Sequence, residues 1–167
     1  MEVVEWIDKI NERIGRISAW IIIPLTFVVV YEVVMRYFFN DPTAWGYDTL
    51  WMLYGAQFML GGAYTLLKKA HVRIDIVYNL LSPRGKLIFD AMVYTFIIFG
   101  TMVLLTWAGI KFAKEAWVTG ERLSTTNWFF PSGPIKTVIP VALFLVSLQS
   151  LADLIRAFSD LKKRKER

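Results

Sequence analysis

Residues Ile17–Phe38 read ISAWIIIPLTFVVVYEVVMRYF, and only two of these 22 side chains, Glu32 and Arg36, are charged. The hydrocarbon core of a bilayer is about 30 Å thick, so a helix needs about 20 predominantly apolar residues to cross it. This stretch therefore predicts a membrane-spanning helix.

Three other stretches have a similar length and the same scarcity of charge. They are Trp45–Leu67, Leu87–Trp107 and Pro134–Ile155. Hydrophobic residues form 56% of the 167 residues, against roughly 45–50% in soluble domains. Because the four stretches occupy more than half of the chain, we expect one all-α transmembrane domain over residues 1–167, with four transmembrane helices.

The composition argues against several other classes of protein. Cysteine is absent and histidine occurs once, as His71, so disulfides, thiolate sites and a haem held by two histidines of this chain are excluded. The net charge is +5, but the basic residues flank the apolar stretches, as they do in membrane proteins. We therefore expect a bilayer rather than nucleic acid as the partner, no cofactor and no enzymatic activity.

The distribution of Lys and Arg predicts the orientation. The N-terminal segment, the connection between the second and third spans and the basic tail 156–167 together hold fourteen of these residues. The two connections on the other side hold four, and Arg36 lies within the first span. Cytoplasmic segments carry the excess of positive charge, so we expect a multi-pass protein with both termini in the cytoplasm.

The first residues have a different pattern. Apolar residues recur at helical spacing among charged ones in Met1–Gly15, from Val3 and Trp6 to Ile14. This pattern predicts an amphipathic helix on the cytoplasmic membrane surface. The alternative is a continuous extension of the first span.

Turn and breaker residues predict where helices end. Asn40-Asp41-Pro42 predicts a turn after the first span. Ser82-Pro83-Arg84-Gly85 marks the restart of the chain into the third span, which we expect to continue past Trp107 until Gly120. Pro140 lies inside the fourth span and should bend it.

Glu32 and Arg36 form the most unusual pair, because charges inside a span are costly and often functional. Four residues apart, they lie on nearly one helix face and can pair. One hypothesis is a proton or cation site. The favoured one is an ion pair that holds the first span against a neighbouring helix.

Other polar residues also allow two interpretations. Tyr54, Gln57, Gly61 and Tyr64 share one face of the second span, where helix packing, the favoured interpretation, or a substrate groove would place them. His71, Arg73 and Asp75 follow that span, and we expect a structural role because their spacing completes no metal site. Gln149, Asp153 and Arg156 form a stripe that should face protein, with Asp90 or Arg73 as candidate partners.

The order of four motifs resembles one known family, the small membrane subunit (Q, DctQ-like) of tripartite ATP-independent periplasmic (TRAP) transporters. The motifs are Glu32-Val33-Val34-Met35-Arg36-Tyr37-Phe38-Phe39-Asn40 with Pro42 and Trp45, then Gly61-Gly62-Ala63-Tyr64, then His71-Val72-Arg73-Ile74-Asp75, and Pro134-Ile135-Lys136 with Ile139-Pro140 and Leu148-Gln149. One departure follows Trp45, where the family pattern has an acidic pair and this chain has only Asp48.

The resemblance implies a role in sodium-coupled uptake of organic acids across the bacterial or archaeal inner membrane. In such a symporter a periplasmic substrate-binding (P) protein captures the solute. A large permease (M) subunit carries the sodium and substrate sites and moves as an elevator. The Q subunit braces the M subunit as a scaffold, and its outer loops, here Asn40–Trp45 and Glu121–Ser132, could contact the P protein.

Two other functions remain as alternatives from the residues alone. The first is a small, self-contained, proton-coupled exporter that acts as a dimer, with Glu32 as the proton carrier. The second is an intramembrane enzyme, which would need histidine partners that this chain mostly lacks.

Overall fold

The computed structural model describes residues 2–70 and 82–165, and in these ranges the chain is helical with no strand. A single isolated bridge pairs Arg122 with Pro131 in a loop. The all-α prediction is confirmed. The helices are α1 Glu2–Ala19, α2 Ile22–Tyr37, α3 Gly46–Leu67, α5 Pro83–Met92, the π-helix η1 Val93–Gly100, α6 Thr101–Thr119 and α7 Gly133–Lys165.

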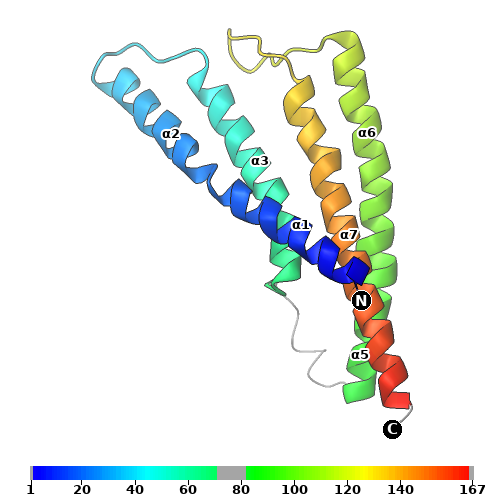
Figure 1. Ribbon diagram of the computed structural model, residues 1–167. Helices are drawn as coiled ribbons and strands as arrows, with labels where there is room; N and C mark the ends of the chain where they lie inside the picture. The colour runs from blue at the N-terminus through cyan, green and yellow to red at the C-terminus, as the bar shows by residue number, and fades with distance from the viewer. Residues whose placement is uncertain (1, 71–81, 166–167) are drawn as a thin grey trace.

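The long helices lie side by side and α1 crosses them (Figure 1). The connections 38–45 and 120–132 lie together at one end of the molecule, which we call the loop end. Both ends of the chain lie away from it. Helix α1 packs on both α3 and α7, and α6 packs along α7.

The boundary between α1 and α2 differs from the predicted start of the first span at Ile17. Helix α1 continues to Ala19, and α2 begins only at Ile22. Pro24 is the physical reason, because its nitrogen has no hydrogen to donate and its ring clashes with the carbonyl four residues earlier. The carbonyl of Trp20 instead accepts a hydrogen bond of the 3₁₀ type, from the N–H of Ile23 three residues later, at 3.1 Å.

The predicted restart of a helix at Ser82-Pro83 and its stop at Gly120 are confirmed. Helix α5 begins at Pro83, and η1 and α6 continue it past Trp107 to Thr119. Gly120 then adopts φ 63° as the C-cap, a left-handed conformation that glycine accepts without the strain of a Cβ. The turn after α2 is also confirmed, with Asn40 at φ 52°.

Small side chains let the helices approach closely. The described core is rich in alanine, and Gly109 of α6 lies against the ring of Pro140 in α7. Close approach through small residues is how helices associate in lipid, where apolar burial supplies little driving force. The buried apolar residues are Val4, Ile7, Ala63, Leu66, Ala113, Ala116, Ala142, Leu145, Ala152 and Ala157.

Two helical stretches among the described residues are long and apolar enough to cross a membrane, Glu2–Tyr37 and Gly133–Ser159. The number of membrane spans, which we expect to be four, therefore stays a prediction. Helix α2 has no buried residue at all, and Phe27 is 76% exposed. A surface of this kind suits lipid or a partner helix rather than water.

Candidate functional site

Helix α1 is joined to α7 by buried polar side chains near the middle of α7. Asn11 and Gln149 are almost completely buried. The Asn11 amide donates to Gln149 Oε1 at 2.8 Å, and Gln149 Nε2 donates to Asp8 Oδ1 at 3.2 Å. A buried polar atom without a hydrogen bond costs free energy, and these bonds satisfy the donors of both amides. Asn11 Oδ1 has no partner among the described residues.

Arg156 extends the same contact. Its guanidinium bridges Asp8 of α1 and Asp153 of α7, with 2.7 Å to Asp153 Oδ1. The stripe Gln149, Asp153 and Arg156 therefore faces protein, and the partners in the described part of the chain are Asp8 and Asn11. The other two candidate partners, Arg73 and the side chain of Asp90, lie outside the described residues.

Helix α1 is joined to α3 by a close backbone approach and an ion pair. Gly15 is buried against Tyr64, and a Cβ at Gly15 would overlap the Cβ and ring of that tyrosine. Glu12 pairs with Arg16 at 2.9 Å and with Lys68 at 3.3 Å. The hydrogen bond from Arg16 and then that from Lys68 lower the pKa of Glu12 below its ordinary value.

At the loop end, Glu32 joins the end of α2 to the start of α3. Its carboxylate accepts from Arg36 at 2.6 Å, from the Thr43 backbone N–H at 3.2 Å and from the Thr43 hydroxyl at 2.5 Å. The same hydroxyl accepts from the N–H of Gly46 at 3.1 Å. Trp45 stacks on Tyr31 with ring centroids 5.6 Å apart. These contacts close the hairpin between the two helices.

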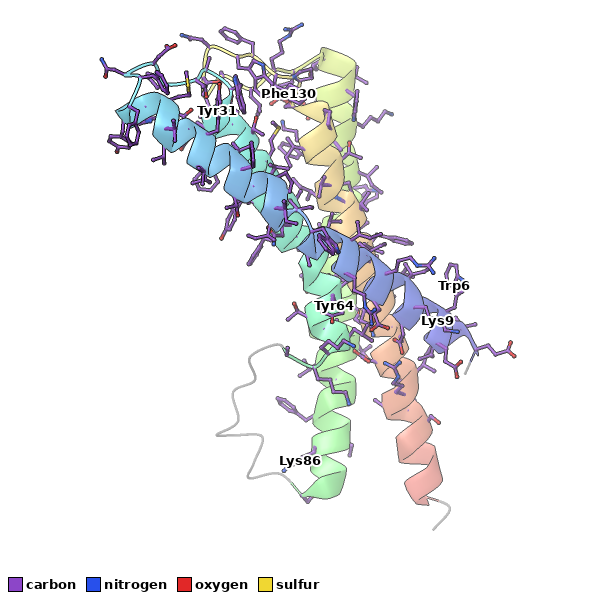
Figure 2. All side chains as sticks on the ribbon, turned by 60° about the vertical axis from the view of Figure 1, so that its left-hand side comes forward. Trp6, Lys9, Tyr31, Tyr64, Lys86 and Phe130 are labelled. Carbon is purple, nitrogen blue, oxygen red and sulfur yellow. The ribbon has the colours of Figure 1, made fainter. Side chains whose placement is uncertain are left out.

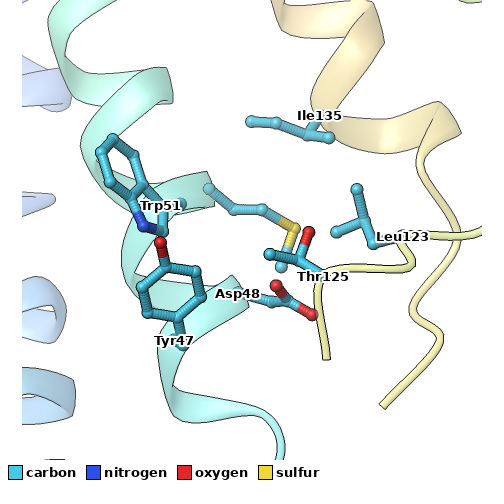
Figure 3. A pocket seen from close by; sticks show the side chains of 7 residues that line it. Tyr47, Asp48, Trp51, Leu123, Thr125 and Ile135 are labelled. Atoms are coloured by element: carbon cyan, nitrogen blue, oxygen red, sulfur yellow. The ribbon is translucent and has the colours of Figure 1, made fainter. Parts of the chain in front are cut away.

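Asp48 joins α3 to the loop 120–132. It is 3% exposed, and its Oδ2 accepts from the Thr126 hydroxyl at 2.5 Å. Beside it lies a groove of about 330 Å³ between α3 and the loop. Figure 3 shows Tyr47 and Trp51 on the α3 side and Leu123 and Ile135 on the other.

A larger, apolar groove of about 650 Å³ lies between α2 and α3. Gln57 and Gly61 line it together with Tyr54 and Thr65. A Cβ at Gly61 would contact nothing within 4 Å, so the described part of this chain makes no close approach there. Tyr54, Gln57 and Gly61 of the predicted face thus line an open groove, whereas Tyr64 of the same face packs on Gly15 of α1.

The structure brings some predicted residues together and leaves others apart. Glu32 and Arg36 pair, and Gln149, Asp153 and Arg156 meet one helix, α1. Gln57 and Gly61 line one groove, and Trp45 lies apart from them against Tyr31. His71, Arg73 and Asp75 lie outside the described residues. Sequence reasoning missed Asp8, Asn11 and Gly15, although Asn11 and Gly15 recur at helical spacing with Ile7 and Ser18 on the buried face of α1.

These contacts describe a protein with long apolar helices, in which several polar side chains join separate segments of the chain. Among the described residues, no group of three His, Cys, Asp or Glu side chains is placed to hold a metal ion.

Comparison with known protein families shows which family this chain belongs to. The model of the DctQ component of tripartite ATP-independent periplasmic transporters matches residues 25–160, and the chain belongs to this family. The chain is also 22% identical, over 144 residues, to the sialic acid TRAP transporter permease protein SiaT of Haemophilus influenzae. The match covers 85% of this chain but only 23% of that relative.

Proposed function

We propose that this chain is the scaffold subunit that braces a large, elevator-type permease subunit in a sodium-coupled, binding-protein-dependent transporter. The observation that carries the proposal is the internal use of its buried and part-buried polar groups. Asn11 with Gln149, Glu32 with Thr43, and Asp48 with Thr126 each join two segments of the chain. Side chains engaged in this way hold helices together and are not free to bind a solute.

We propose an organic acid as the transported solute. Two observations support this class: the family of the chain, and the name of the relative, which refers to sialic acid. The sodium and substrate sites then belong to the large subunit, as the family resemblance implies.

Two surfaces are suited to the partners. The apolar groove between α2 and α3, next to the exposed side of α2, could accept a helix of the large subunit. The loop end, with the groove beside Asp48, would lie on the periplasmic side in the predicted orientation and could contact the substrate-binding protein.

Co-purification tests this function. A tagged chain should retain a large polytopic permease from native membranes, and Arg36→Ala or Arg73→Ala should lower assembly or uptake without changing which solute is preferred. Normal assembly and uptake in both variants would count against the roles of these two residues, and failure to retain a permease at all would count against the scaffold.

The self-contained exporter has weaker support. A proton carrier must release and regain its proton, yet both oxygens of Glu32 are engaged, one by Arg36 and one by Thr43. Ion pairing and hydrogen bonds to a carboxylate favour its charged form.

A further inference from the structure

Helix α1 has three faces rather than two. One face, with Val4, Ile7 and Asn11, is buried on α3 and α7. A second is apolar and exposed: Val3 is 65% exposed, Trp6 63% and Ile17 63%. Figure 2 shows Trp6 projecting from α1. Burial against the other helices therefore uses only part of the apolar surface of α1.

The third face is cationic and borders the exposed apolar face. At about 100° of rotation per residue, Lys9, Arg13 and Arg16 fall within a sector of about 60°, next to the sector of Trp6 and Ile17. These three cations line a shallow groove of about 350 Å³ with Glu12, Ile17 and Trp20. Arg16 pairs with Glu12, whereas Lys9 and Arg13 form no ion pair within the described ranges 2–70 and 82–165.

We propose that this groove binds the headgroup of an anionic phospholipid in the leaflet that α1 contacts. Lys and Arg supply the charge, and a guanidinium can bond two phosphate oxygens at once. Ile17 and the 70% exposed Trp20 offer an apolar surface to the start of the acyl chains. Charge and apolar surface side by side fit a lipid better than a free anion, which would need the cations alone.

This inference does not depend on the transporter role, since it uses only the surface of α1. Juxtamembrane basic residues are attracted to anionic lipid by about fivefold in binding constant for each cation near the surface.

Native mass spectrometry of the purified full-length chain tests the site by titration with phosphatidylglycerol or phosphatidylcholine. The wild-type chain should bind the first phosphatidylglycerol more tightly than phosphatidylcholine. Lys9→Gln combined with Arg13→Gln should lower phosphatidylglycerol binding at least about fivefold and leave phosphatidylcholine binding unchanged.

A matched control removes the same charge elsewhere. Lys111→Gln combined with Lys114→Gln, on the exposed side of α6, should leave phosphatidylglycerol binding near the wild-type value. The proposal would be overturned if both double variants lost phosphatidylglycerol binding equally, or if neither lost any. It would also be overturned if inorganic phosphate displaced the lipid.

A second measurement does not depend on these variants. Because the chain has no cysteine, Trp6→Cys gives a single position for a fluorescent label. In phosphatidylglycerol-containing vesicles the label should be quenched by lipid-borne quenchers and protected from iodide in the water. Quenching by iodide, or cross-linking of this position to the large subunit in place of lipid, would overturn the proposal.

Discussion

Gly15 illustrates how a single missing side chain can fix the position of a helix. Tyr64 of α3 occupies the space that a Cβ at position 15 would need. A Cβ added to Gly55 or to Gly61 would instead have no other atom within 4 Å. The glycines thus differ in role although all three lie in helices. Only the contact that Gly15 makes with a neighbouring helix distinguishes it from the other two, and this contact cannot be read from the sequence.

We predict that Gly15→Ala destabilises the protein by about 1–3 kcal/mol, the usual cost of overpacking a close contact. The atom in the way is the Tyr64 Cβ, which cannot move without its backbone. Thermal unfolding in detergent, followed by circular dichroism, measures the effect.

Gly61→Ala is the matched control. Its Cβ meets open space, and alanine favours a helix over glycine by up to about 1 kcal/mol, so its stability should be unchanged or slightly raised. Equal destabilisation by the two substitutions would show that the contact with Tyr64 has no special effect.

Glu32 and Arg36 should contribute unequally to stability although they form one ion pair. The Glu32 side chain is 14% exposed and accepts from both groups of Thr43, while Arg36 is 51% exposed. We expect Glu32→Ala to cost about 1–3 kcal/mol, since it leaves part-buried donors unpaired. Arg36→Ala should cost about 0–1 kcal/mol, as exposed pairs do.

Chemical unfolding of the two variants in detergent gives this comparison. A larger loss for Arg36→Ala than for Glu32→Ala would mean that the ion pair, not the bond to Thr43, holds the hairpin between α2 and α3.

At the scale of the element, α1 depends on the amide pair Asn11 and Gln149. A double-mutant cycle with Asn11→Ala and Gln149→Ala should give a coupling of about 0.6–1.7 kcal/mol, the range measured for such bonds between membrane helices. Limited proteolysis reports the coupling, since cleavage within α1 requires this helix to detach from α3 and α7 and unfold locally. Additive effects of the two substitutions would contradict a direct bond.

Element boundaries were predictable wherever a breaker residue acts locally. Pro83 and Gly120 limit the third helical run, and the turn at Asn40 ends the first, because proline and positive φ constrain the backbone whatever surrounds them. The break between α1 and α2 also has a local cause, Pro24. It was not predicted because the residues around Pro24 form one continuous apolar run. The number of bilayer crossings is a property of the chain in lipid and stays a prediction.

At the scale of the whole molecule, polar residues were identified more reliably than their partners. The stripe Gln149, Asp153 and Arg156 was predicted to face protein because its spacing places it on one face of a helix. Its partners Asp8 and Asn11 lie at the other end of the sequence, and only packing brings them there. Glu32 and Arg36 were predictable as a pair because they are four residues apart on one helix.

The central claim is that this chain supports transport without carrying a solute. Reconstitution in vesicles with an imposed sodium gradient tests it most directly, with a labelled organic acid outside. We predict no uptake by the purified chain alone, and uptake once the large permease subunit and the substrate-binding protein are added. Solute accumulation by this chain alone would contradict the account.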